Sequence, residues 1–414
     1  MAVSAKGRAA MPYGWGRVPY AYADRLPWMN LPFPIEEYRE RLRGLGRLMA
    51  REGLWCLVVL GNRADGANIR YLANFEDFYG GDSLLVVPQE GPPGFTTNAV
   101  MHGEPMHSGI QDCWIEDVRC AAAPRTVTGT ASPATVFDHV EDLITERGCD
   151  RGSIGVVGEG DVDRLVQFLR DTFPHARVTH AGPLLREMRA IKSPREIEVL
   201  RRACHLADEA ARAAMDAVRP GVTEFDLAAE AYYAMFKAGA EHPAFAIGLC
   251  AGARAGFKHM APTAYRVREG DMVYIDVGGR YMGYHSDTSR QRVCGTPTAE
   301  QLRFMETQIA MVEEVMAAAR PAAVIGELAE IAVARAREAG YSEYLYFRGH
   351  GVGAATQDLP AFAPGNPAQL EENMVFAFEP MLVRAGFGTA CWEDVWCVTA
   401  SGVERLNQCP IRWW

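Results

Sequence analysis

Five residues with metal-binding side chains occur in apolar, strand-like segments of the last third of the chain, and they constrain its fold more than any other feature. They are Asp276, Asp287, His350, Glu379 and Glu393. Four carboxylates that converge on one site repel one another unless cations lie between them, and two divalent ions would balance their charge. Oxygen and imidazole donors without thiolates suit Mn²⁺, Co²⁺, Fe²⁺ or Zn²⁺. The pattern therefore predicts a fold that gathers these residues around two divalent metal ions.

Two of the acids interrupt segments that have the composition of buried strands. Glu379 follows the apolar run 373–378, and Glu393 lies within the segment 391–398. Acids are most often solvated surface charges, but a carboxylate in a buried strand costs free energy unless it has a partner. We therefore interpret both glutamates as ligands.

The two aspartates and the histidine lie beside glycines. Asp276 and Asp287 flank the pair 278–279, and we expect two strands joined at that pair, with one acid on each. Whether the two acids meet depends on the strand register, which the sequence leaves open. His350 lies in the glycine-rich stretch 349–353, where the backbone can approach whatever the imidazole contacts.

Together these stretches resemble the motifs of the M24 peptidase family, which contains Xaa-Pro dipeptidases, aminopeptidases P, methionine aminopeptidases and creatinases. The matching stretches are Asp276 and Asp287 separated by ten residues, the Gly-His-Gly loop at 349–353, Glu379-Pro380 and Glu393-Asp394. The resemblance implies an α+β chain in which an α/β creatinase-type N-terminal domain precedes a pita-bread catalytic domain. It also implies a homodimer and a hydrolase that cleaves a C–N bond in a dipeptide or a small non-peptide amide.

The same resemblance assigns two catalytic roles. His259, in the stretch 257–262, would approach the substrate and help with proton transfer, and Glu379 would assist proton transfer from water to the leaving nitrogen. His102 and His107 are candidates for a contribution from a neighbouring subunit.

Three residues depart from the family pattern around the expected substrate. A second family histidine, seven residues after the ligand histidine, is replaced by Gln357, which cannot titrate near neutral pH, and Asp358 follows where the family usually has Glu. An arginine two residues before the last ligand is replaced by Cys391, and Arg384 is a candidate substitute for binding a substrate carboxylate. We expect Gln357, Asp358 and Arg384 to bind substrate, and cleavage of ordinary prolyl peptides stays an open question.

Because of these departures from the family pattern, two other functions remain open. The first is a metal-dependent lyase that acts on a small zwitterion, as in dimethylsulfoniopropionate lyases, with Asp358 as the base that abstracts a carbon-bound proton. The second is a non-catalytic binding module, against which the complete ligand set argues. A new amine among the products would indicate hydrolysis, whereas an alkene would indicate elimination.

Length and helix-start signals predict the domain organisation. At 414 residues the chain has room for two domains. We expect an N-terminal arm at 1–34, the creatinase-like domain at 35–190 and the pita-bread domain at 191–414. Helices are expected after Ser193, Thr223 and Thr298, because each is followed three residues later by an acid or an amide that can complete a capping box.

The net charge and the distribution of cysteines limit the kinds of binding partner and the cell compartment. The net charge of −10 argues against nucleic acid and acidic membrane surfaces, which leaves a small-molecule or dipeptide substrate as the expected partner. Residues 1–20 contain no apolar run, so we expect neither a signal peptide nor a membrane span. The ten cysteines lack paired spacing and indicate reduced thiols in a cytoplasmic protein.

Overall fold

The computed structural model describes residues 22–62, 66–76, 81–100, 112–122, 135–158, 162–257, 259–346 and 349–414. The chain divides into two compact units, Met1–Met188 and Arg189–Trp414. His102, His107 and residues 1–21 of the expected arm lie outside the described residues. In the described part of the chain, no helix has an apolar stretch long enough to cross a bilayer.

The N-terminal unit is built on a six-stranded sheet with the order β4-β3-β2-β1-β5-β6. The strands are β1 (Cys56–Gly61), β2 (Ser83–Pro88), β3 (Gly94–Val100), β4 (Asp117–Ala122), β5 (Ser153–Val157) and β6 (Arg177–His180). The helices are α1 (Tyr22–Arg25), α2 (Ile35–Arg51), α3 (Ala67–Ala73), α5 (Val136–Glu146), α6 (Val162–Thr172) and α7 (Gly182–Ala190), with a 3-10 turn at Leu26–Trp28. The central strand β1 is apolar and buried along its whole length, as expected for a strand covered on both faces. Side chains of β1, β2 and β5 form a core with those of α5 and α6.

In its described residues, the C-terminal unit combines four further helices with several short antiparallel sheets. The helices are α8 (Pro194–Asp216), α9 (Glu224–Lys237), α10 (Ala299–Ala318) and α11 (Ile325–Glu338), with 3-10 turns at Gly252–Gly256 and Ser342–Tyr344. The first strands are β7 (His242–Pro243), β8 (Gly248–Ala251), β9 (Met272–Val277), β10 (Gly279–Tyr281), β11 (Tyr284–His285) and β12 (Thr288–Val293). The later strands are β13 (Leu345–Tyr346), β14 (Gly349–Gly351), β15 (Asp358–Ala361), β16 (Val375–Phe378), β17 (Met381–Arg384), β18 (Gly388–Ala390), β19 (Asp394–Val398) and β20 (Val403–Arg405).

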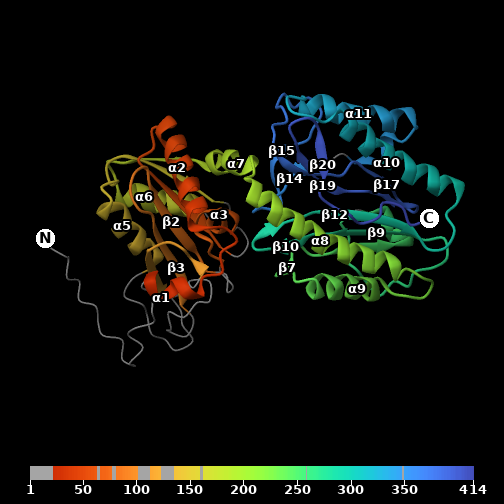
Figure 1. The fold of residues 1–414 in the computed structure, drawn as a ribbon, viewed down its shortest axis with the longest axis horizontal. Helices are drawn as coiled ribbons and strands as arrows, with labels where there is room; N and C mark the ends of the chain where they lie inside the picture. Colours follow the sequence, from red (N-terminus) through yellow and green to blue (C-terminus); the bar gives the residue numbers. More distant parts are fainter. Residues whose placement is uncertain are drawn as a thin grey trace. The chain divides into compact units, whose positions relative to one another are not determined.

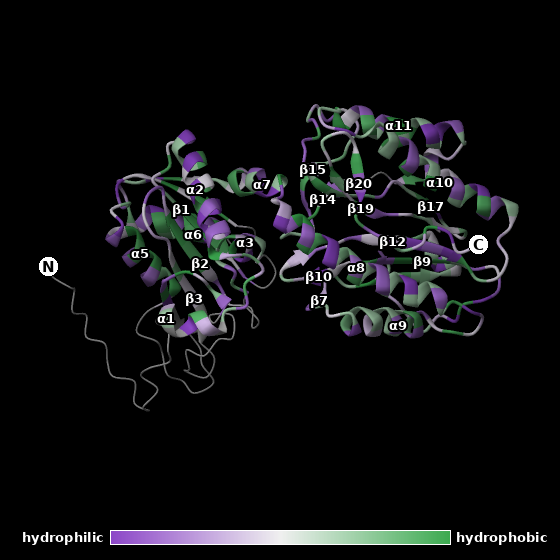
Figure 2. Ribbon diagram, in the orientation of Figure 1, coloured by the Kyte–Doolittle hydropathy of each residue, from purple (hydrophilic) through white to green (hydrophobic). Residues whose placement is uncertain are grey.

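Within this unit the strands form an inner layer between two pairs of helices. The sheets have the orders β11-β10-β7, β12-β9-β8, β13-β17-β18 and β15-β14-β16-β19-β20. Helices α8 and α9 lie on one side of the strands, and α10 and α11 lie on the other (Figure 1). One hydrophobic core joins α8 and α9 to β8 and β9, and a second joins α10 and α11 to β16 and β19. Hydrophilic stretches of the helices alternate with hydrophobic ones, as expected when one helix face packs on the strands (Figure 2).

The predicted helix starts are confirmed. Helices α8, α9 and α10 each begin with a capping box, in which two side chains satisfy backbone groups reciprocally. The pairs are Ser193 with Glu196, Thr223 with Asp226, and Thr298 with Gln301.

The predicted turn at 278–279 is wrong. The hairpin between β10 and β11 turns instead at Met282 and Gly283, whose φ values of 49° and 82° suit a tight two-residue turn. Gly278 and Gly279 are needed for close packing: a Cβ on Gly278 would lie 2.2 Å from the Ser286 carbonyl oxygen, and one on Gly279 would lie 2.7 Å from that of Ala203 in α8.

Candidate metal centre

The register between β9 and β12 brings the two aspartates to one face of the sheet. Ser289 on β12 lies directly opposite Asp276 on β9. Asp287 lies directly before β12 and precedes Ser289 by two residues, and residues two apart along an extended chain point to the same face. Both residues are almost fully buried, with exposed fractions of 6% for Asp276 and 8% for Asp287.

Ser289 also joins these strands to the segment that carries Glu393. The backbone N–H of Ser289 donates to the carbonyl of Glu393 at 3.3 Å, and the N–H of Glu393 donates back at 3.2 Å. The Ser289 hydroxyl then donates to Oε2 of Glu393 at 2.7 Å. Ser289 was not among the predicted site residues, although it follows Asp287 by only two residues.

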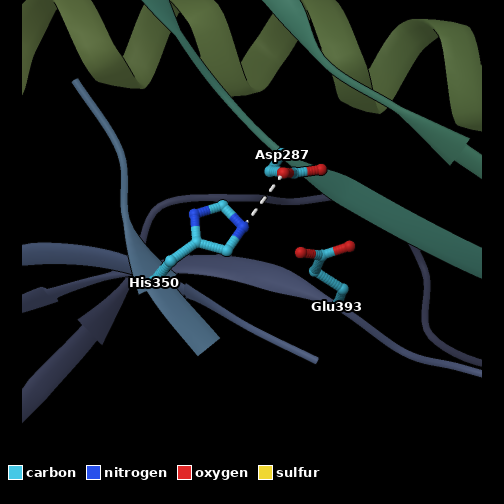
Figure 3. Close-up of side chains that lie close together, drawn as sticks. All are labelled: Asp287, His350 and Glu393. Carbon is cyan, nitrogen blue, oxygen red and sulfur yellow. Dashed lines mark ion pairs between the residues drawn. The ribbon is translucent and has the colours of Figure 1, made fainter. Parts of the chain in front are cut away.

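His350 points into the same space from β14 (Figure 3). Its Nδ1 lies 3.1 Å from the carbonyl oxygen of Gly351, so Nδ1 carries the proton that this hydrogen bond needs and Nε2 faces the carboxylates. Nε2 lies 3.5 Å from Oδ2 of Asp287 and 3.8 Å from Oε1 of Glu379. Glu379 directly follows β16, which pairs with β14.

The side chains form two overlapping groups of potential ligand atoms, each with all atoms within 4.8 Å of one another. One group is Asp287, His350 and Glu393, and the other is Glu379, Cys391 and Glu393. Glu393 belongs to both, as expected for a carboxylate between two cations. We call Asp276, Asp287, His350, Glu379 and Glu393 the candidate metal centre.

The buried carboxylates of the candidate metal centre would be stabilised by cations. Oδ1 of Asp276 and Oε1 of Glu393 are buried and have no hydrogen-bond partner among the residues that the structure describes. Burial, and then the charges of Asp287, Glu379 and Asp276, raise the pKa of Glu393 well above its usual value. Unpaired buried carboxylate oxygens are costly. Because divalent cations would remove both costs, the donor set fits two such ions.

His259 lies at the edge of the candidate metal centre. Its Nδ1 is 3.1 Å from Oδ2 of Asp276, and its side chain is 38% exposed. The backbone of His259 has a φ of +54°, which is uncommon for a residue with a side chain and indicates a tightly determined loop.

A buried acid that was not among the predicted site residues holds this loop. Glu224 is fully buried at the start of α9. It accepts hydrogen bonds from the backbone N–H of Ala251 at 2.9 Å, the N–H of Thr263 at 2.8 Å and the Thr263 hydroxyl at 2.6 Å. Arg254 donates to it as well, at 3.2 Å. Glu224 therefore fixes both ends of the segment that carries His259.

Two family models match the chain. The metallopeptidase family M24 model matches residues 198–400, and the creatinase/prolidase N-terminal domain model matches residues 41–191. A Xaa-Pro dipeptidase of Lactobacillus helveticus is 35% identical over 296 residues, which is 71% of this chain and 80% of the relative. The chain belongs to metallopeptidase family M24.

Further comparisons agree with this assignment. A Xaa-Pro dipeptidase of Pyrococcus horikoshii is 34% identical over 226 residues, which covers 54% of this chain and 64% of the relative, just under two thirds of its length. The solved prolidase structure from Pyrococcus horikoshii has a TM-score of 0.77 at 24% identity and covers 90% of this chain and 99% of that one. The predicted fold class, a creatinase-type N-terminal domain followed by the M24 catalytic domain, is confirmed.

The residues that depart from the M24 pattern lie in different surroundings. Gln357 is exposed just before β15. The side chain of Asp358 is fully buried, and its Oδ2 and Oδ1 accept from Nε and Nη2 of Arg189 at 3.0 and 3.1 Å. Both carboxylate oxygens of Asp358 are therefore bound in a bidentate ion pair, although Asp358 lies opposite Gly351, the neighbour of His350.

Arg384 contacts other residues than those of the candidate metal centre. Its Nη1 donates to Oε1 of Glu300 at 2.6 Å. Its guanidinium lies 4.7 Å from the ring centre of Phe387 and 5.5 Å from that of Tyr344. Substrate binding by Gln357, Asp358 and Arg384 stays a prediction, and the ion pairs of the last two argue against it.

Proposed function

We propose that this M24 protein is a two-metal hydrolase that cleaves the C–N bond of a Xaa-Pro dipeptide or of a related small amide. The observation that carries the proposal is the clustering of buried ligand atoms from Asp287, His350 and Glu393, with Glu379 beside them. The names of the relatives from Lactobacillus and Pyrococcus support the choice of a dipeptide as substrate.

The proposed roles follow from the contacts of each residue. Asp276, Asp287, His350, Glu379 and Glu393 would hold the two ions. Ions of this kind supply Lewis acidity, which polarises an amide carbonyl and makes water a better nucleophile at neutral pH. The hydrogen bond between Nδ1 of His259 and Asp276 orients the ring, and Nε2 would be the atom that takes part in proton transfer with the substrate. Glu379 would accept the proton of the attacking water and pass it to the leaving nitrogen.

Elimination is a less favoured chemistry for this site. The lyase hypothesis used Asp358 as the base, and a base must reach a proton on the substrate. Both carboxylate oxygens of Asp358 are occupied by Arg189, and the side chain is fully buried. The non-catalytic hypothesis does not explain why potential ligand atoms of Asp287, His350, Glu379 and Glu393 gather in one buried place.

A substrate screen on metal-loaded protein tests the proposal. Xaa-Pro dipeptides and small non-peptide amides would be incubated with the protein, and the products would be assayed for new amines and for alkenes. We expect a new amine, with loss of activity on chelation and recovery on addition of Mn²⁺ or Co²⁺. Hydrolysis that survived complete removal of metal, or an alkene as the main product, would contradict the proposal.

Replacement of His259 by alanine separates proton transfer from metal binding. We expect kcat/KM to fall about 10²- to 10⁴-fold, the usual contribution of a positioned acid or base, while both ions remain bound. Kinetics and metal analysis of the same preparation measure the two effects. His205→Ala is the matched control, because His205 is an exposed histidine on α8 of the same unit. Unchanged kinetics in the His259 variant would remove this residue from the mechanism.

The metal, the assembly and the cell compartment are further parts of the proposal. Carboxylates dominate the candidate metal centre, which favours Mn²⁺ or Co²⁺ over softer ions if these residues alone bind. A homodimer follows from the family resemblance. A reducing compartment such as the cytoplasm suits the cysteines that the structure describes, which are free and buried.

The domain limits are proposed as well. We propose an N-terminal arm at residues 1–34, a creatinase-like domain at 35–190 and a catalytic domain at 191–414. The limit between residues 190 and 191 is supported by the division of the chain into two compact units between Met188 and Arg189.

A further inference from the structure

Cys391 lies among the carboxylates of the candidate metal centre. Its Sγ, one carboxylate oxygen of Glu379 and one of Glu393 all lie within 4.8 Å of one another. The side chain of Cys391 is fully buried, as is that of Glu393. In the sequence, Cys391 stands out only because it replaces an arginine, whereas the fold places its thiol beside two candidate ligands.

The backbone around Cys391 is held firmly. Its N–H donates to Oε1 of the buried Gln291 on β12 at 2.7 Å. The N–H of the next residue, Trp392, donates to Oε1 of the buried Gln308 on α10 at 2.7 Å. Because both amide side chains are buried and fixed, the thiol has a determined position relative to Glu393.

A second observation indicates that Glu393, which lies beside the thiol, needs a cation as a partner. Oε1 of Glu393 is fully buried and has no hydrogen-bond partner in the part of the chain that the structure describes. Zinc lies about 2.3 Å from a thiolate sulfur and about 2.0–2.2 Å from a carboxylate oxygen, so the two donors of one ion are at most about 4.5 Å apart. The separations of Cys391, Glu379 and Glu393 are in this range or slightly above it.

We propose that Cys391 is a further metal ligand, which gives one of the two metal positions a mixed donor set of one sulfur and carboxylate oxygens. The thiol proton passes to solvent when the sulfur binds the ion, and no electron is transferred. A thiolate favours Zn²⁺, Co²⁺ or Cd²⁺ over Mn²⁺, so this protein would select softer ions than a centre of oxygen and imidazole donors. The inference rests on the proposed two-metal centre.

Titration of Co²⁺ into the metal-free full-length protein tests the inference by spectroscopy. Visible ligand-field bands report that Co²⁺ is bound, and a near-ultraviolet charge-transfer band reports a sulfur ligand. We expect both bands in the unmodified protein. The variant Cys391→Ser should keep the visible bands and lose the charge-transfer band, because its hydroxyl replaces the sulfur.

A matched control is provided by Cys397→Ser. Cys397 is also buried, lies on the adjacent strand β19, and its Sγ contacts the carbonyl oxygen of Val398 instead of the carboxylates. This variant should keep both bands. In competition with Mn²⁺, Cys391→Ser should weaken Cd²⁺ binding by at least about tenfold, since even loss of an outer-shell partner commonly costs that much.

The outcomes separate this inference from the proposed function. Visible bands without a charge-transfer band, or a charge-transfer band that persists in Cys391→Ser, would overturn the role of Cys391 and leave the two-metal centre intact. Absence of any visible band in the unmodified protein would overturn the two-metal centre itself.

Discussion

Replacement of Glu393 by alanine is expected to remove metal binding and, with it, hydrolysis. Glu393 belongs to both groups of potential ligand atoms, so its loss affects both metal positions. Lewis-acid stabilisation is worth several kcal/mol, and each 1.36 kcal/mol is a factor of ten, so kcat/KM should fall on the order of 10³-fold or more. Metal content after gel filtration and kinetics on the same sample measure the effect.

The surface residue Glu404 supplies the control. Its carboxylate is 45% exposed and pairs with Arg201 at 2.7 Å, so Glu404→Ala should keep both metals and full activity. The Glu393→Ala variant should still fold, because removing a buried carboxylate with an unpartnered oxygen relieves a cost in the metal-free protein. A Glu393 variant that bound two ions and kept its activity would contradict the assignment.

The sequence identifies the candidate ligands better than it identifies their surroundings. A glutamate at the end of a buried apolar strand is conspicuous in local sequence, because the cost of burying it requires a partner. Glu379 and Glu393 were found in this way, and the fold places both beside His350 or its neighbours.

The contacts that could not be predicted from the sequence join residues that are far apart along the chain. Asp358 pairs with Arg189, 169 residues earlier, and nothing local to Asp358 marks that partner. Glu224 holds the loop of His259 through hydrogen bonds to residues 27 and 39 positions later. The turn at 278–279 was misplaced because glycines serve both turns and close packing, and only the contact with α8 distinguishes the two uses.

Replacement of the buried Arg290 by methionine is expected to destabilise the protein strongly. Arg290 contacts the backbone of the candidate metal centre. The side chain of Arg290 is fully buried. Its Nη2 lies 2.7 Å from Oδ1 of Asp394, and both side chains of this ion pair are 0% exposed. It also donates to the carbonyl oxygens of Ser289 and Glu393, each at 2.8 Å, and of Pro410 at 2.7 Å. Arg290 thus ties the strand of the aspartates to the backbone of Glu393.

Without Arg290, Asp394 keeps only the partly exposed Arg405 as a cationic partner, and the carbonyl oxygens of Ser289, Glu393 and Pro410 lose a donor. Loss of one partner of a buried pair typically costs about 3–5 kcal/mol. We expect Arg290→Met to lower the free energy of unfolding by this amount in urea denaturation of metal-free protein, where no bound ion adds to stability. The matched control is Arg412→Met, which breaks a pair with Glu306 that is 41% and 43% exposed and should cost at most about 1 kcal/mol. Equal urea midpoints for the two variants would show that Arg290 contributes no more than a surface charge. Because the same guanidinium holds the Glu393 carbonyl, the Arg290 variant should also bind metal more weakly, whereas the Arg412 variant should not.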